Sequence, residues 1–170
     1  MLALMSAFEM SAFEVVTPSA LPPSFRRLLD HTASMTATLA AHWNGPLTAL
    51  VLCHGMTADG AVLVRRVVLV TGTGELPVEI AEVRVRTSAL DEGVLRRLAS
   101  ITVPFGRSLH QEGIAFTTEP VSFFKVTANE ALAEAGRTAP GTPMFGRTAR
   151  LWLADGRCPL GETVEILPRV

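Results

Sequence analysis

Charged residues inside apolar strands are the positions of this sequence with the clearest capacity for chemistry. In the last predicted strand, Glu162 alternates with Leu160, Val164 and Ile166, and alternate residues of a strand share one face. Glu162 is therefore expected to point inward, whereas Glu165 on the other face has more solvent-like neighbours. An unpaired inward carboxylate is driven toward its neutral form and needs a cation, a hydrogen-bond donor or a ligand. A structural ion pair at the sheet edge is the alternative.

Two consecutive arginines, Arg65 and Arg66, lie in a predicted strand whose two faces are both apolar. Because adjacent strand residues point to opposite faces, one of the two guanidinium groups is expected to point into the core. Arginine keeps its charge there and needs an anionic partner, which its planar fork can hold through two parallel bonds. The partner is either an internal glutamate or a carboxylate ligand. Periodicity does not choose between the two arginines.

Two short segments, Pro104–Arg107 and Met144–Arg147, each combine an aromatic residue, a glycine and an arginine. Glycine lets backbone amides approach another group closely, so these amides are candidates to bind a ligand oxygen. An ordinary turn is the alternative interpretation.

The cysteines and histidines give weaker signals. Cys53 and His54 resemble a nucleophile and base, but adjacent strand residues point apart, so a catalytic pair is not expected. Cys53 and Cys158 are interpreted as reduced core thiols, with a disulfide between them left open. The four histidines form no metal motif, and no P-loop, Rossmann fingerprint or zinc-ligand spacing occurs. Neither a metal nor an organic cofactor is expected.

The elements that must position these side chains follow from hydrophobic periodicity and turn residues. Predicted strands span Leu47–Cys53, Ala61–Val70, Val78–Arg86, Ile114–Val126, Arg147–Leu153 and Leu160–Leu167. Helices are expected after Ser24, from Ser34 to Trp43, from Ser88 to Leu98 and from Asn129 to Ala135. Gly72-Thr73-Gly74 and Asp155-Gly156 signal hairpin turns. Short turns between most strands predict an α+β domain, with a single antiparallel β-sheet and helices packed against it.

The composition sets the remaining expectations. The chain has 170 residues, a formal net charge of -1 and 48% hydrophobic residues, which predicts one domain with a thick core around a ligand cavity. Near-zero charge argues against nucleic acid or an anionic membrane as a partner. No apolar run is long enough to cross a bilayer and no basic residue precedes Arg26, so a cytoplasmic protein is expected. Residues 1–20, which contain a tandem MSAFE pentad, are expected to be a frayed helix or disordered extension before a domain at residues 21–170.

Four blocks of the sequence, taken in order, resemble the bacterial chorismate pyruvate-lyase family. They are Ser34-Met35-Thr36, RRVVLVTGTGE with Arg66, PFGRSL at Pro104–Leu109, and GRTARLWLADGRCPLGE at Gly146–Glu162. The resemblance covers roughly Leu28 to Pro168 and implies a chorismate lyase-like fold with an enclosed ligand pocket. The section Gly113–Gly141 matches poorly. Glu79 and Glu82 stand where the family is more neutral or basic, which puts the substrate in question.

The resemblance also implies site residues and a reaction. Arg66 and Glu162 correspond to the catalytic residues, with Arg66 holding the ring carboxylate and Glu162 assisting proton transfer at the ether oxygen. Met35, Phe105 and Gly106 are the implied substrate-binding residues. The implied enzyme is a carbon–oxygen lyase of biosynthesis that eliminates pyruvate from chorismate to give a hydroxybenzoate such as 4-hydroxybenzoate, without a cofactor. The expected partner is a small carboxylic acid, and the expected state is a monomer or small homo-oligomer.

Two other functions remain open at this point. One is a lyase or cyclase of the same fold that acts on a different small substrate in specialised metabolism. The other is a non-catalytic domain like the ligand-sensing domains of transcription regulators, which use the same fold. The region before Ser24 is too short for a winged helix, which weighs against the sensor. In its favour, inward charges bind ligands as readily as they catalyse.

Overall fold

The computed structural model describes residues 13–72, 76–98, 103–154, 156 and 158–170. Its strands are β1 (Phe13–Val16), β2 (Leu47–Met56), β3 (Val62–Thr71), β4 (Pro77–Arg86), β5 (Phe116–Thr127), β6 (Pro143–Leu153) and β7 (Pro159–Leu167). Its α-helices are α2 (Pro23–Leu29), α3 (Met35–His42), α4 (Glu92–Leu98), α5 (Phe105–Gln111) and α6 (Glu130–Gly136). None of the helices in this part of the chain is long and apolar enough to cross a bilayer.

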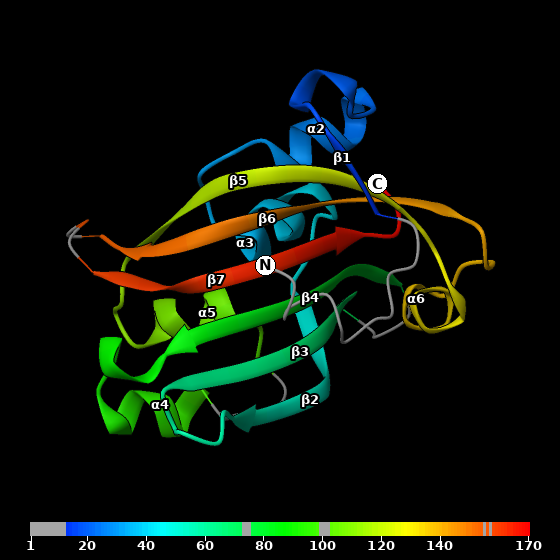
Figure 1. Ribbon diagram of the computed structural model, residues 1–170. Helices are drawn as coiled ribbons and strands as arrows, with labels where there is room; N and C mark the ends of the chain where they lie inside the picture. The colour runs from blue at the N-terminus through cyan, green and yellow to red at the C-terminus, as the bar shows by residue number, and fades with distance from the viewer. Residues whose placement is uncertain (1–12, 73–75, 99–102, 155, 157) are drawn as a thin grey trace.

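The strands form one antiparallel sheet in the order β1-β5-β6-β7-β4-β3-β2 (Figure 1). Two meanders, β2–β3–β4 and β5–β6–β7, are joined where β4 pairs with β7. The predicted α+β architecture, a single antiparallel sheet with helices packed against it, is therefore confirmed.

Three local features differ from the sequence-based expectation. α5 forms at a segment where the sequence predicts no helix, and β1, which pairs with β5, lies within the expected N-terminal extension. Ser88 lies in a short 3₁₀ turn, Thr87–Ala89, and α4 begins only at Glu92. Residues 1–12, together with Thr73, Gly74 and Asp155 of the expected hairpin turns, lie outside the described residues. The flanking strands nevertheless pair as predicted.

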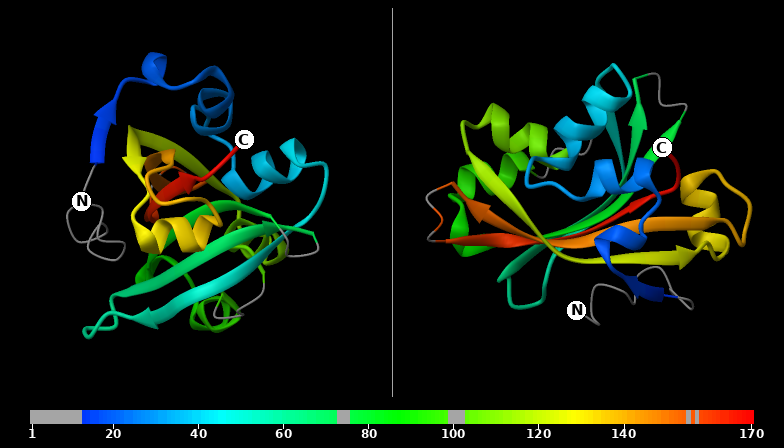
Figure 2. Two further views of the ribbon diagram at one scale, coloured as in Figure 1. Left: turned by 90° about the vertical axis from the view of Figure 1, so that its right-hand side faces the viewer. Right: turned by 90° about the horizontal axis from the view of Figure 1, so that it is seen from above.

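The two faces of the sheet have different coverings (Figure 2). Residues paired across neighbouring strands share a face. One face, called the helix face below, lies under α2, α3, α4 and α5, and one of its cross-strand rows is Val67, Ala81, Glu165 and Arg147. The opposite face, called the outer face, packs against α6 at one end, and one of its rows is Arg66, Glu82, Val164 and Thr148.

Apolar clusters hold the helices on both faces. α2 and α3 pack Leu28, Leu29 and Leu39 against the helix face, and α4 and α5 add Leu95, Leu98 and Leu109 at its other end. On the outer face, α6 packs Leu132 and Ala133 against Val68, Ile80 and Phe124. Full burial of one such leucine contributes about 1.5–3 kcal/mol, so the helix face is firmly covered at both ends.

Gly161 permits the close approach of β7 to β4. A Cβ at this position would lie 2.0 Å from the carbonyl oxygen of Arg84, a backbone atom that cannot rotate away. We expect Gly161→Ala to push the two strands apart and to lower the free energy of unfolding by roughly 1–3 kcal/mol, as overpacking does. Urea denaturation measures this. The matched control is Gly55→Ala on β2, where nothing lies within 4 Å of the added carbon. An equal loss in both variants would contradict the explanation.

Candidate functional site

A small cavity lies between the helix face and the helices α3 and α5. Its volume is about 40 Å³, which gives room for only a few water-sized groups. Apolar residues such as Met35, Val83 and Phe105 form part of its wall. The polar side chains that line it are Ser34, Thr36, Glu79, Thr118, Thr163 and Glu165. We call it the inner cavity.

A larger recess of about 490 Å³ adjoins the inner cavity. The two share the lining residues Ser34, Thr36, Gly106 and Phe116, and the recess adds mostly apolar wall from α3 and the segment before β5. Arg107 and His110 of α5 also line it. Its volume is in the range of small-molecule sites. We call it the outer recess, and together the two spaces form the candidate site.

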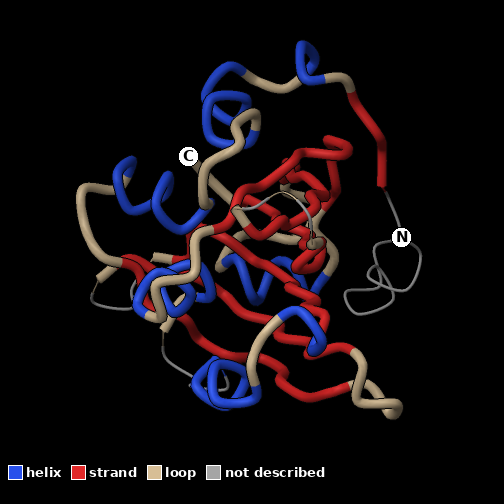
Figure 3. The backbone as a smooth tube through the Cα atoms, turned by 90° about the vertical axis from the view of Figure 1, so that its left-hand side faces the viewer, coloured by secondary structure: helices blue, strands red, loops and turns tan. Residues whose placement is uncertain are grey.

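Packing of α3 against α5 shapes this site. Figure 3, seen from the left-hand side of Figure 1, shows helices in blue along one side of the red strands. Ser34 is the N-cap of α3 and Pro104 is the N-cap of α5, and both have extended rather than helical backbone angles. A Cβ on Gly106 would lie 2.6 Å from Oγ of Ser34 and 3.3 Å from Oγ1 of Thr36. Only glycine at position 106 therefore lets the two helices approach this closely without displacing the Ser34 and Thr36 side chains.

A buried ion pair forms the floor beside the inner cavity. Nε of Arg147 donates to Oε2 of Glu165 at 2.5 Å, and the arginine is fully buried. Its Nη1 donates to the carbonyl oxygens of Leu29 at 2.6 Å and His31 at 2.8 Å. The guanidinium thus joins the sheet to the end of α2.

Glu79 is a buried acid of the site that has no hydrogen-bond donor among the described residues. It lies on β4 with 2% of its surface exposed. Burial raises the pKa of Glu79 well above the ordinary carboxyl value, and the nearby Glu165 raises it further, against a smaller opposing effect of Arg147. In the free protein the Glu79 carboxyl is therefore held toward its neutral form.

The raised pKa of Glu79 predicts a pH-dependent stability. The folded state holds this proton more tightly than the unfolded chain, so stability is fully present below the ordinary carboxyl pKa and is lost as the pH rises through the raised pKa. In that window we expect the free energy of unfolding to fall by up to about 1.4 kcal/mol per pH unit. Glu79→Gln should remove this slope, as measured by urea unfolding at several pH values. The same slope in the variant would show that another group is responsible.

The buried pair predicts a large effect when one partner is removed. Arg147→Ala leaves the Glu165 carboxylate uncompensated beside Glu79, and we expect a loss of roughly 3–5 kcal/mol in unfolding free energy. The control is Arg97→Ala on α4, whose ion pair with Glu112 is solvent-exposed and should matter far less. Thermal and urea unfolding of both variants provide the comparison. Similar losses would contradict a structural role for the buried pair.

Three of the residues implied by the resemblance lie at the site. Met35 and Phe105 line the inner cavity, and Gly106 lines both the cavity and the recess. Phe105 also packs edge-on against Phe116, with ring centroids 6.4 Å apart. These residues come from α3, α5 and the start of β5, which the fold brings together.

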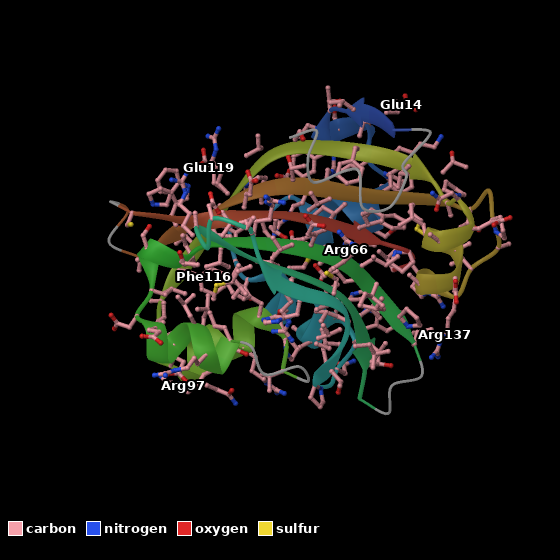
Figure 4. All side chains as sticks on the ribbon, turned by 60° about the horizontal axis from the view of Figure 1, so that its bottom comes forward. Glu14, Arg66, Arg97, Phe116, Glu119 and Arg137 are labelled. Carbon is pink, nitrogen blue, oxygen red and sulfur yellow. The ribbon has the colours of Figure 1, made fainter. Side chains whose placement is uncertain are left out.

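Arg66 and Glu162 lie elsewhere, on the outer face. Nη2 of Arg66 is 2.7 Å from Oε2 of Glu82, and Arg84 lies between Glu82 and Glu162 at 3.7 and 3.8 Å. The Glu162 side chain is 50% exposed. Figure 4 labels Arg66 near the middle of the sheet and Phe116 at the end that α4 and α5 cover. The expectation that Arg66 and Glu162 converge inside an apolar chamber is therefore wrong.

The error at Glu162 has two physical causes. Leu160 is fully buried, but the β6–β7 register shifts between Leu151 and Trp152, so Leu160 has no cross-strand partner and does not report the face of Glu162. Val164 and Ile166 do share that face, but they are buried there by the α6 cluster. Glu162 is therefore at the uncovered end of the outer face, where a charge is solvated.

In the strands β3 and β7, the charged residues that point toward the helix face are not Arg66 and Glu162 but other residues of the same two strands. Arg65 is 3% exposed and donates from Nη2 to the carbonyl oxygen of Val103 at 2.7 Å, so it is the inward member of the arginine pair. Glu165, not Glu162, is the inward glutamate. Glu79 was visible in the sequence as an acid at odds with the resemblance, and Arg147 as part of an aromatic-Gly-Arg segment.

Neither cysteine lines the cavity or the recess. Cys53 and Cys158 are both free, but Cys53 is exposed on β2, so the expectation of a core thiol is wrong there. Cys53 pairs with Arg66 across β3. Within the described residues, no three His, Cys, Asp or Glu side chains gather as metal ligands would.

Known structures define the class of fold. No protein-family model matches the sequence, and no curated protein matches it. The effector domain of PhnF from Mycobacterium smegmatis superposes with a TM-score of 0.62 at 19% identity, covering 79% of this chain and 87% of that domain. The ligand-binding domain of a protein assigned to the GntR family of transcriptional regulators, from Bordetella bronchiseptica, gives 0.54 at 16% identity, covering 72% and 83%. The chain thus has the chorismate lyase-like fold of these effector domains.

Longer structures match over part of their length. PhnF from Mycobacterium smegmatis gives a TM-score of 0.63 at 19% identity, with 81% of this chain covering 64% of that one. This chain therefore spans somewhat less than two thirds of PhnF. At such identities the likeness establishes the fold alone.

These neighbours correct the enzymatic expectation. They are effector and ligand-binding domains, so the assignment as a chorismate-cleaving carbon–oxygen lyase that forms 4-hydroxybenzoate and pyruvate is wrong. They support the alternative, a non-catalytic ligand-binding domain, better than the lyase. One of these structures is assigned to a family of transcriptional regulators. The expectation that this chain has no nucleic-acid partner is therefore not confirmed.

Proposed function

We propose that this chain is a ligand-binding domain that senses a small polar molecule without converting it. The observation that carries the proposal is the inner cavity under α3 and α5, where Glu79 is buried and without a described hydrogen-bond donor. A polar group in that condition is stabilised by a ligand that supplies the missing partner. The effector domains of similar fold support the same class of function.

The geometry also supports binding without chemistry. The charged pair next to the cavity, Arg147 and Glu165, is engaged in mutual contacts and in contacts to the end of α2. Arg66 and Glu162, the residues expected to catalyse, are on the other face of the sheet. A ligand that fills the site touches α3, α5 and the sheet together, so occupancy alters how these elements pack.

A screen of small metabolites by thermal unfolding tests the proposal. A ligand at 100 times its Kd should stabilise the fold by about 2.7 kcal/mol, and this should raise the Tm of a chain of this size by roughly 2–4 °C per kcal/mol. We expect hits whose affinity falls about 10-fold or more in Gly106→Ala, because the added methyl group occupies the junction of cavity and recess.

Gly55→Ala, far from the site on β2, is the control and should bind each hit like the wild type. Chorismate should survive incubation with the protein unchanged. Pyruvate release that depends on residues of the site would contradict a purely sensing role. Hits whose affinity is the same for Gly106→Ala as for the wild type would contradict binding at this site.

A further inference from the structure

Charge balance in the inner cavity carries a more specific conclusion about the ligand. Two carboxyl groups, Glu79 and Glu165, line the cavity, and Arg147 is the guanidinium beside them. Arg147 forms its ion pair with Glu165 and no ion pair with Glu79. The cluster therefore lacks one cation if both acids are ionised.

No neighbouring group supplies that cation within the described part of the chain. From β6, Arg147 donates from Nε to Glu165 and from Nη1 to the carbonyl oxygens of Leu29 and His31; its Nη2 is buried without a hydrogen-bond partner among the described residues, and it forms no ion pair with Glu79. From the segment after α2, His31 contacts the same region, but burial and the charge of Arg147 lower the pKa of its imidazole. On β3, the residue paired with Glu79 is Leu69, which is uncharged. A cation that pairs with an ionised Glu79 therefore has to come from a bound molecule; without one, burial holds Glu79 toward its neutral form.

We infer that the ligand of this site presents a primary ammonium group to the carboxylate of Glu79; this inference rests on the proposed function. The inner cavity, at about 40 Å³, is the size for one such group and little more. The outer recess, at about 490 Å³, then holds the body of the molecule against Ala37, Ala40 and Ile114. Arg107 at the recess accommodates an anionic group at the far end of the same molecule.

Binding of an ammonium group is coupled to the protonation of Glu79. In the free protein the carboxyl is held toward its neutral form because burial raises its pKa. The ammonium ion favours the carboxylate, so one proton leaves Glu79 when the ligand binds at a pH below that raised pKa. Affinity then increases by up to about 10-fold per pH unit, and it levels off once Glu79 is ionised in the free protein. A ligand that instead accepts a hydrogen bond from neutral Glu79 binds more weakly as the pH rises.

Calorimetric titration of matched amines and alcohols tests the inference on the whole chain. The probes are n-butylamine with n-butanol, 2-phenylethylamine with 2-phenylethanol, and 4-aminobutanoate with 4-hydroxybutanoate. At least one amine should bind at least about 30-fold more tightly than its alcohol, the effect expected of a desolvated charge pair. Glu79→Gln should abolish that preference and leave the affinity for the alcohol within a few fold. Glu162→Gln, an exposed acid on the outer face, is the control and should preserve it.

The pH dependence of the wild-type affinity gives a second measurement that needs no variant. An affinity for the amine that rises with pH supports the inference. Alcohols that bind as well as amines, or an amine affinity that falls with pH, would overturn it, and so would a panel in which no amine binds. Such a failure leaves the proposed function intact if other library compounds bind in a manner sensitive to Gly106→Ala. If no small molecule binds, both fail.

Discussion

The buried guanidinium of Arg147 is the constraint on which the arrangement of the site depends. It cannot lose its proton, so the chain must keep an anion and several acceptors around it. Glu165 provides the anion from the neighbouring strand, and the carbonyl groups of Leu29 and His31 provide acceptors from the end of α2. These contacts fix the chain just before α3 begins. The roof of the inner cavity therefore takes its position from a charge buried in the sheet.

Most of the fold could be predicted from local signals, because hairpins and their flanking strands are encoded by short-range patterns. The Asn129 cap of α6 illustrates this: its side chain accepts from the backbone N–H of Leu132 at 2.9 Å, as a helix N-cap does. α5 could not be recognised, since its seven residues include Gly106, a poor helix former, and its formation depends on packing against α3. β1 is likewise a strand because β5 offers it an edge.

The site was harder to predict than the fold, because both faces of the sheet are partly apolar. Periodicity establishes that Arg65 and Arg66 point to opposite faces, and that Glu162 and Glu165 do too, but not which face holds the ligand. That choice depends on where α6 and the other helices pack, which is a long-range property. Met35, Phe105 and Gly106, which the resemblance implies as binding residues, line the cavity or the recess because each lies on a helix that borders it. The charges were placed on the wrong face because their surroundings are set by tertiary contacts.

The helix face thus carries two kinds of buried charge with different consequences. The pair of Arg147 and Glu165 is held by contacts within the protein, through Nε and Nη1 of the arginine, so it supports the fold whether or not a ligand is present. Glu79 has no such partner among the described residues, and its ionisation is opposed by burial and by Glu165. A group of this kind adds little to the stability of the empty protein at neutral pH, but it changes state when a complementary molecule arrives. Keeping the structural charge separate from the responsive one lets a domain stay folded while empty and still distinguish the bound state from the free one.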